Sequence, residues 1–157
     1  MSLKIKLVAV GTRMPKWVSD GYEEYAKRLN ADVRLELIEI PLGFRGKNPD
    51  LKQALAQESS KIREVIPAND YVIALEVTGK PWSTTDLAEQ LRSWKMQGQT
   101  VALLVGGPDG LPNDCVALAQ QKWSLSKLTL PHPLVRVILA EQLYRAWSIT
   151  QNHPYHR

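Results

Sequence analysis

Hydrophobic and polar positions follow two different periods along the chain. Stretches with the two-residue period of strands alternate with stretches that have the three-to-four-residue period of helices. Residues 3–10 (LKIKLVAV) alternate apolar residues with lysines before the run turns wholly apolar, which predicts a first strand. Residues 15–29 place apolar side chains three and four positions apart, which predicts a helix. The same patterns predict further strands over 33–40, 70–77, 100–105 and 126–130, and further helices over 50–66, 86–96, 113–121 and 133–150.

Strands and helices therefore alternate over the full length, with short loops between them. This order is typical of the α/β class, in which a mainly parallel sheet is flanked by helices. The run at 100–105 (TVALLV) is apolar throughout, as expected of a central parallel strand that is covered on both faces. No linker, internal repeat or low-complexity tract divides the chain, so we expect a single domain over residues 1–157.

The predicted helix at 133–150 differs from the others, because its apolar residues cover nearly its full circumference. A helix that is apolar all round must be buried on several sides. Either a second copy of the chain packs against it, or it lies at the centre of its own domain, and we favour the homodimer. Among its polar residues, Glu141 and Arg145 are spaced for an ion pair, whereas Arg136 has no obvious local partner.

The composition excludes several classes of protein. Of the 157 residues, 44% are hydrophobic and 23% are charged, which is ordinary for a globular protein and too apolar for a disordered chain. No apolar run approaches the roughly 20 residues of a membrane span, and the N-terminus resembles a strand more than a secretory signal. The single cysteine, Cys115, cannot form an internal disulfide, so we expect a reducing, cytoplasmic location and a packed thiol.

The positive charge is concentrated toward the C-terminal end. Residues 1–114 hold fifteen basic and fifteen acidic residues, whereas residues 115–157 hold five basic residues, one acidic residue and all three histidines. An acid-poor, positive surface attracts polyanions such as nucleic acid, although a chance imbalance of a few charges explains the same numbers. A second basic pair, Arg45 and Lys47, lies in a glycine-rich loop and either contacts a partner or is simply solvated.

Three loops follow predicted strands, at residues 75–82, 103–112 and 128–136. Because the carboxyl ends of parallel strands share one edge of a sheet, these loops are expected to converge on a pocket. The middle loop (LLVGGPDGLP) contains Gly106 and Gly107, which either let the backbone approach a ligand or form a tight turn. It matches neither the dinucleotide fingerprint nor the phosphate-binding loop, so an adenosyl group fits better than ATP.

Other candidate chemistry is sparse. His132 lies between two prolines, which stiffen the chain, and it is a base, a hydrogen-bond donor or a turn residue; the residues alone favour the turn. The histidines lack the spacing of metal ligands, so no metal site is predicted. No serine lies in the G-x-S-x-G pattern of hydrolases. Of the five tryptophans, Trp82 follows a proline in a loop and is expected to be the most exposed.

Several motifs together resemble one known family. They are LVAVGT near the start, LEVTGKPW in the middle, LLVGGPDGL, LSKLTLPHPLVRVILAEQLYRAWSI and the terminal HPYHR. Over essentially the whole chain, the sequence closely resembles the ribosomal RNA large subunit methyltransferase H family, which belongs to the SPOUT class. The resemblance implies S-adenosylmethionine-dependent methylation of N3 of a pseudouridine in bacterial 23S rRNA, on the assembled ribosome and by a homodimer. It also implies a deep trefoil knot in the cofactor-binding part, about residues 70–157, which general rules of topology do not predict.

The resemblance also implies roles for individual residues. The residues that match the cofactor-binding loops are Leu75, Gly106, Gly107, Ser126, Lys127, Leu128, Thr129, Leu130 and Pro131. RNA is expected near His132, Arg136 and Arg157. The candidates for removing the N3 proton, or for stabilising the resulting anionic base, are Arg136, Tyr155 and His156. Our hypothesis is that the tail of one subunit reaches the pocket of the other subunit.

Two other classes of protein fit part of the pattern. A ribosome-associated module of the same fold, binding RNA without catalysis, would show the same charge and the same glycine loop. A nucleotide-binding α/β regulator fits less well, because the phosphate-binding motifs are missing. The complete set of three loops, together with the tail, favours the enzyme.

Overall fold

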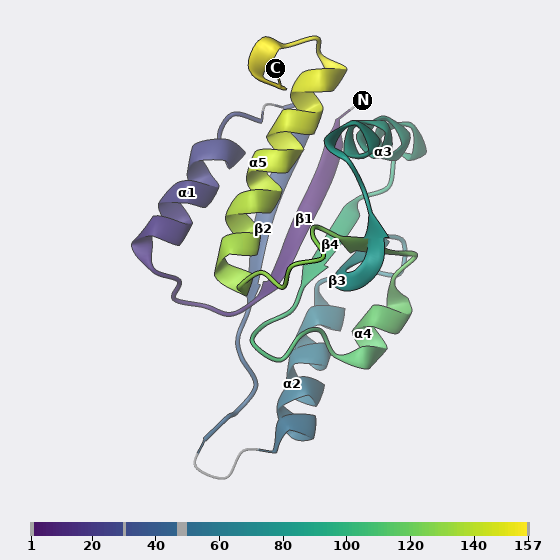
Figure 1. Cartoon of the computed structure of the whole chain (residues 1–157). Helices are drawn as coiled ribbons and strands as arrows, with labels where there is room; N and C mark the ends of the chain where they lie inside the picture. The colour runs from purple at the N-terminus through teal and green to yellow at the C-terminus, as the bar shows by residue number, and fades with distance from the viewer. Residues whose placement is uncertain (1, 30, 47–49, 157) are drawn as a thin grey trace.

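Five parallel strands form the sheet at the centre of the molecule (Figure 1). The computed structural model describes residues 2–29, 31–46 and 50–156. The strand order is β2-β1-β4-β3-β5, and each neighbouring pair is parallel. The strands are β1 (Leu3–Val10), β2 (Val33–Ile40), β3 (Tyr71–Pro81), β4 (Val101–Val105) and β5 (Gln121–Ser124). The α/β class with a mainly parallel sheet, which the sequence predicts, is confirmed.

Helices cover both faces of this sheet. They are α1 (Lys16–Ala26), α2 (Leu51–Glu64), α3 (Thr84–Gln97), α4 (Asn113–Leu118) and α5 (His132–Thr150), followed by the short 3₁₀ helix η1 (Pro154–His156). Helices α1, α3 and α5 pack on one face, and α2 and α4 pack on the other. Side chains of β1 alternate accordingly: Ile5 and Leu7 face the three-helix layer, and Val8 and Val10 face α2 and α4. Two apolar cores therefore lie back to back across the sheet.

One predicted strand is wrong, and the difference bears on the site. The pattern predicts a strand over 126–130, whereas the last strand is β5, anchored beside β3 by the buried Trp123. Beyond β5, the Ser126 hydroxyl accepts the backbone N–H of Leu128 at 2.9 Å, so the segment bonds locally instead of to a neighbouring strand. Leu128 is 72% exposed, so the alternating leucines here do not mark a buried face.

The other predicted elements are confirmed, with shifts of a few residues at their ends. β1 and β2 have the predicted bounds, while β3 continues past Val77 to Pro81. Helix α3 begins at a capping box, in which the Ser83 hydroxyl accepts the Asp86 N–H and the Asp86 carboxylate accepts the Ser83 N–H. Ser83 is therefore the N-cap of α3, three residues before the predicted start of the helix.

The buried face of α2 is not purely apolar. Leu51, at the start of the helix, is 47% exposed, whereas two polar residues, Glu58 and Ser59, are buried. Cys115 of α4 is completely buried, with its sulfur 3.5 Å from the Ser59 hydroxyl oxygen, and burial raises the pKa of its thiol. Cys115 is a packed residue, as the sequence predicts, and is held in its unreactive thiol form.

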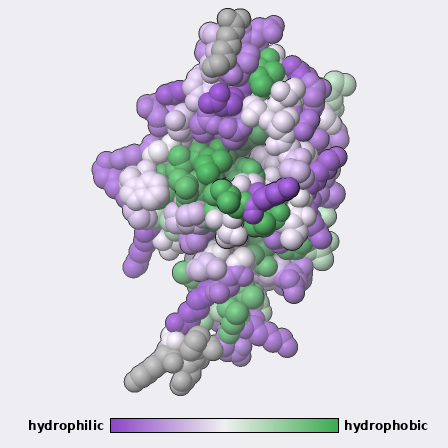
Figure 2. All heavy atoms as spheres, viewed as in Figure 1, coloured by the Kyte–Doolittle hydropathy of each residue, from purple (hydrophilic) through white to green (hydrophobic). Residues whose placement is uncertain are grey.

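Helix α5 lies against the sheet, between α1 and α3 (Figure 1). Gly21 of α1 lets the helices approach closely, because a side-chain Cβ there would lie 3.3 Å from the methyl groups of Val137. The apolar circumference of α5 is thus satisfied largely within the chain. On its outer side, Leu134 and Ile138 remain half-buried, and Figure 2 shows an apolar patch over this part of the molecule. Across the described residues, no helix is both long and apolar enough to span a membrane.

The prediction for the exposed tryptophan is wrong. Trp82 is half-buried, and its ring stacks on that of Trp123 with 4.8 Å between the ring centroids. Trp17, near the start of α1, is 57% exposed instead. Proline and loop position alone did not reveal that Trp82 packs against another aromatic ring.

A buried arginine joins α5 to two distant parts of the chain. The Arg136 side chain is only 2% exposed. Its Nη1 donates to Glu39 Oε2 of β2 at 2.6 Å, and its Nη2 donates to the Gly11 carbonyl oxygen at 2.7 Å. Gly11 ends β1 with a φ of +119°, a conformation that favours glycine. Arg136 therefore holds the loop between β1 and α1 against the start of α5.

We expect Arg136→Ala to lower the free energy of unfolding by about 2–3 kcal/mol, because it removes both hydrogen bonds of a buried cation. The loss stays below that of a fully buried pair, since the Glu39 side chain is 37% exposed and can be hydrated. Urea unfolding measures this change. Arg92→Ala, which breaks the exposed pair with Glu89 on α3, is the control and should change stability by less than about 0.5 kcal/mol. Equal effects of the two substitutions would contradict the structural role of Arg136.

Candidate functional site

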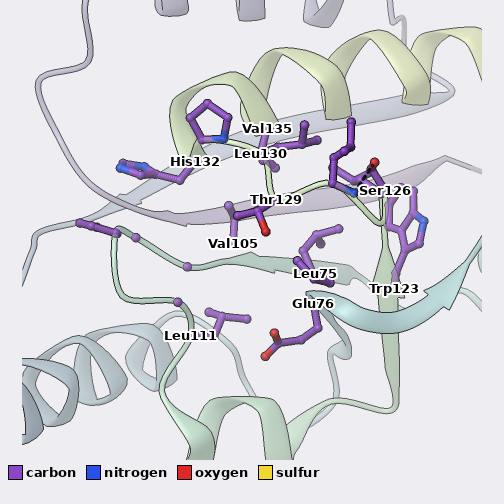
Figure 3. A pocket seen from close by; sticks show the side chains of 18 residues that line it. Leu75, Glu76, Val105, Leu111, Trp123, Ser126, Thr129, Leu130, His132 and Val135 are labelled. Atoms are coloured by element: carbon purple, nitrogen blue, oxygen red, sulfur yellow. Dashed lines mark hydrogen bonds between the residues drawn. The ribbon is translucent and has the colours of Figure 1, made fainter.

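A cavity of about 370 Å³ opens at the edge of the sheet where the strands end (Figure 3). Three segments enclose it: residues 75–77 within β3, where the pairing with β5 is interrupted between Leu75 and Lys80, residues 105–111 from the end of β4, and residues 125–132 after β5. Its size lies within the usual range for pockets that bind small ligands. The predicted convergence of three segments is confirmed, but the first of them is part of β3 and not a loop that follows it.

The structure brings together most of the predicted cofactor residues. Eight of the nine line the cavity, namely Leu75, Gly106, Gly107, Ser126, Leu128, Thr129, Leu130 and Pro131. The ninth, Lys127, does not line it, although both of its neighbours do. The segment 126–130 reaches the cavity because it leaves the sheet after β5, so the wrongly predicted strand is part of the wall.

The glycine loop is shaped by close packing on its far side. The Gly110 N–H donates to the Gly107 carbonyl oxygen at 3.1 Å, and Gly110 has a φ of +78°, which closes a tight turn. A Cβ at position 107 would lie 2.9 Å from a methyl carbon of Val10 and 3.3 Å from one of Leu42. Glycine at 107 is therefore required by packing against Val10 and Leu42. Of the two alternatives open at the sequence level, the structure shows the tight turn.

The wall of the cavity is mainly apolar, with few polar side chains. Leu111, Val105 and Val135 contribute apolar surface, and Trp123 closes one end of it (Figure 3). Glu76 is the only acidic side chain among the described lining residues. The sequence did not single out these residues as site residues. Glu76, Val105 and Trp123 lie within strands, Leu111 lies in the loop after β4, and Val135 lies in the first turn of α5, so no shared sequence signal marks them.

His132 lies at the margin of the cavity, at the first position of α5. Burial and the nearby positive charge of Arg136 lower the pKa of its imidazole, so the ring is neutral at pH 7. Its Nδ1 is buried and has no hydrogen-bond partner among the described residues. A neutral imidazole in this state can accept a proton or a hydrogen bond from a bound molecule.

The structure does not place Arg136 where the sequence expects it to act. Its guanidinium is buried and paired with Glu39 and Gly11, so direct contact with RNA or with a reacting base would require both bonds to break. The partner that the sequence could not supply lies 97 residues away, on β2. The geometry assigns Arg136 a positioning role for the loop beside the cavity.

The C-terminal tail folds back along α5, away from the cavity of its own chain (Figure 1). Tyr155 Oη donates to Glu141 Oε2 at 2.8 Å, and the Ser148 hydroxyl lies 3.2 Å from His156 Nδ1. Burial and this hydrogen bond raise the pKa of Tyr155 to about 12, so its phenol is protonated at pH 7. Glu141 lies nine residues beyond His132, which is about 14 Å along the helix axis. The predicted catalytic residues are therefore not assembled within one chain.

Some predictions concern residues that the structure does not describe. Arg157, expected near RNA, and Lys47 of the basic loop both lie outside the described residues. Arg45, the other member of that loop, pairs with Glu58 and Asp109. Among the described residues, no cluster of three His, Cys, Asp or Glu side chains is arranged to hold a metal ion.

Two solved structures share this architecture. A probable methyltransferase from Bordetella pertussis Tohama I superposes with a TM-score of 0.58 at 17% identity, over 92% of this chain and 96% of that one. A probable methylase family protein from Haemophilus influenzae Rd KW20 has a TM-score of 0.58 at 13% identity, over 99% of this chain and 70% of that one. At such low identity, these similarities establish the fold alone.

Comparison with known sequences identifies the family to which this chain belongs. A family model described as "Predicted SPOUT methyltransferase" matches residues 3–156. The protein named "Ribosomal RNA large subunit methyltransferase H" from Marinomonas sp. strain MWYL1 is 60% identical, over 99% of this chain and 100% of its own. The protein of the same name from Hahella chejuensis is 59% identical, over 99% of both chains. The chain therefore belongs to the SPOUT methyltransferases, within the ribosomal RNA large subunit methyltransferase H family.

Proposed function

We propose that this protein methylates N3 of a pseudouridine in 23S rRNA on the assembled ribosome, with S-adenosylmethionine as the methyl donor. One observation carries the proposal: the three loops expected to bind the cofactor line a single cavity, in a chain of this methyltransferase family. The methyl-transfer class follows from the family. The names of the two relatives support large-subunit ribosomal RNA as the substrate. The particular base is an inference from the resemblance of the motifs.

The cavity suits an adenosyl group. Leu75, Leu130 and Val135 offer apolar surface for the adenine ring, and Thr129 adds a hydroxyl. Gly106 and Gly107 line the cavity with backbone atoms, which can form hydrogen bonds with a ligand. Few convergent polar groups in a mainly apolar wall are typical of cofactor sites. The residues present therefore fit S-adenosylmethionine.

The protein's part in the reaction is mainly alignment and exclusion of water. When bound, S-adenosylmethionine supplies a methyl group on a sulfonium, which needs no further activation. The loops at 105–111 and 125–132 hold the ligand from two sides, so the target nitrogen can be aligned with the methyl group. Arg136 keeps the loop after β1 against this edge of the sheet through the Gly11 carbonyl. The site thus depends on a rigid arrangement of loops on a sheet.

The N3 proton of the base must leave, and two histidines are candidates to take it. His132 is neutral at pH 7, with its Nδ1 buried and without a partner among the described residues, at the margin of the cavity. His156 is the other candidate, but it lies by Ser148, sixteen residues beyond His132 and about 24 Å along α5. Tyr155 requires release from Glu141 before its phenol can act. We assign Tyr155 and His156 to the cavity of a second subunit.

A homodimer is the arrangement that brings these groups together. The outer side of α5 keeps Leu134 and Ile138 half-buried, and Figure 2 shows an apolar patch over this part of the molecule. A second copy packed on this patch would lie beside the start of α5. Its tail, once released from its own helix, would then be close to the first copy's cavity. Arg157, at the end of that tail, adds a positive charge for the RNA.

We further propose that residues 1–157 act as one SPOUT domain located in the cytoplasm, with the knot in the part from about 70 to 157. Every lining residue of the cavity falls between Leu75 and Val135, within that part. A knot in this part would hold together the same segments that line the cavity. A ribosomal substrate places the protein in the cytoplasm.

The proposed function is tested first by calorimetric titration with S-adenosylmethionine at a known subunit concentration, followed by transfer of a labelled methyl group to ribosomes. We expect binding, and transfer to 23S rRNA in assembled ribosomes that lack the modification. Because a small domain reads the shape of its site, a bare 23S transcript should be a poor substrate. Binding to ribosomes without transfer would support the non-catalytic module. Stabilisation by ATP, but not by S-adenosylmethionine, would support a nucleotide-binding regulator.

Glu76→Gln tests whether the acidic wall of the cavity attracts the positive cofactor. We expect the Kd for S-adenosylmethionine to rise about fivefold, which is about 1 kcal/mol. The Kd for S-adenosylhomocysteine, which lacks the sulfonium charge, should rise less than twofold. Both constants are measured by calorimetry, with Glu89→Gln on the surface of α3 as the control. If the Kd values of the two ligands rise equally, Glu76 contributes to the shape of the cavity and not through its negative charge.

Deletion of residues 155–157 tests the tail. We expect methyl transfer to ribosomes to fall by at least about a hundredfold, the scale of a lost acid–base group, while the Kd for S-adenosylmethionine stays within about twofold. His153→Ala is the matched control: His153 packs edge-on against Tyr144, 6.4 Å between ring centroids, and its loss loosens the tail without shortening it. Unchanged methyl transfer by the deletion variant would show that the tail takes no part in the reaction.

A further inference from the structure

The loop between β2 and α2 is tied to the glycine loop by Arg45. Arg45 Nε donates to Asp109 Oδ2 at 2.9 Å, and Arg45 Nη1 donates to Glu58 Oε2 at 2.6 Å. Nη1 also donates to the Gly43 carbonyl oxygen at 3.0 Å. The Arg45 guanidinium thus bridges the carboxylate of Glu58 in α2 and the carboxylate of Asp109 at the tip of the glycine loop. Asp109 lies 64 residues beyond Arg45 in the chain.

Glu58 gives this bridge a fixed end. Its side chain is completely buried, and its Oε2 also accepts the Gly43 N–H at 2.9 Å. A buried carboxylate is strongly destabilising unless cations and hydrogen-bond donors surround it. Arg45 is therefore held in place by Glu58 and Gly43, and it donates its Nε–H to Asp109 in a rigid, planar geometry. Its Nη2 is buried without a hydrogen-bond partner among the described residues.

Asp109 connects Arg45 to the glycine loop that lines the cavity. It lies between Pro108 and Gly110, both of which line the cavity, but Asp109 itself does not line it. Its side chain is turned toward Arg45, on the far side of the loop. Leu42, from the same segment as Arg45, packs against the space beside Gly107. The glycine loop is thus supported from behind at two points by the β2–α2 loop.

We propose that Arg45 is a positioning residue for cofactor binding: through Asp109 it holds the glycine loop, residues 106–110, in the conformation that receives S-adenosylmethionine. The inference rests on the proposed cofactor pocket and adds a residue outside it. It also gives Arg45, one of the two basic residues of that loop, a role other than contact with a partner or simple solvation. Arg45 is neither, because both of its bonded carboxylates belong to this chain.

The test uses substitutions that leave Glu58 paired. Asp109→Ala removes only the outer end of the bridge, and we expect it to raise the Kd for S-adenosylmethionine about tenfold, the loss of one charge-assisted hydrogen bond. Asp109→Asn keeps an oxygen that accepts from Arg45 Nε, so its Kd should rise by only about two- to threefold. Arg45→Lys retains a cation for Glu58 but cannot bridge two carboxylates, so it should match Asp109→Ala.

Two readouts separate positioning from a general loss of structure. The KM for S-adenosylmethionine should rise in parallel with the Kd, while kcat at saturating cofactor stays within about twofold and Tm within about 2 °C of wild type. The double variant Arg45→Lys/Asp109→Ala should be no weaker than either single variant, because both remove the same contact. Asp114→Ala is the matched control: Asp114 pairs with Ser59 and Arg63 on the same side of the sheet, outside the cavity wall.

The outcomes distinguish this inference from the proposed function. If wild type and Asp114→Ala bind the cofactor and Asp109→Ala binds it equally well, the positioning role of Arg45 is overturned and the pocket stands. If the losses of Arg45→Lys and Asp109→Ala add in the double variant, the two residues act separately and the bridge is likewise rejected. If the wild-type protein binds no S-adenosylmethionine, the assignment of the cavity as a cofactor pocket is wrong, and the positioning role of Arg45 is rejected together with it.

Discussion

Parallel pairing of the five strands is the constraint on which the rest of this structure depends. Parallel neighbours need a crossover between them, so every strand ends at the same edge and the helices return the chain to the other edge. The interrupted part of β3 and the loops after β4 and β5 meet at this edge although they lie far apart in the sequence, and they enclose the cavity. The position of the site is therefore a consequence of the sheet, before any side chain is considered.

Buried charges then determine the shape of the loops at that edge. Arg136 joins α5 to β2 and to the carbonyl of Gly11, and Arg45 joins α2 to the tip of the glycine loop. In both cases a cation is held between groups from different elements, and moving one of them would leave a polar group buried without a partner. Such bonds add little net stability compared with apolar packing, but they permit few alternative loop conformations. That property suits a site whose main task is to align two reactants.

Helix α5 connects the cavity with the tail and sets the distance between them. His132 begins the helix at the cavity margin, whereas Tyr155 and His156 bind to positions further along its length. A rigid helix cannot shorten this distance, so the tail of a chain does not meet the cavity of the same chain while it is docked. This geometry is the physical reason for assigning the tail to a second subunit, which the apolar outer side of α5 would accommodate.

Local patterns of the sequence determined four of the five strands, the order of the elements and the convergence of the three segments on the cavity. Side-chain periodicity decides which residues can form β1 and β2, and the alternation of strands and helices makes the strands parallel. The two strands and their parallel arrangement can therefore be predicted from the sequence alone. The motifs of the loops and of α5 also sufficed to indicate the family. Three features were decided only by tertiary structure: the segment 126–130 leaves the sheet, α2 buries Glu58, and Arg136 finds Glu39 97 residues away. Each of these features depends on contacts between groups that are remote in the sequence. The sequence pattern gives the type of each residue but does not show which distant residue it contacts when it is buried.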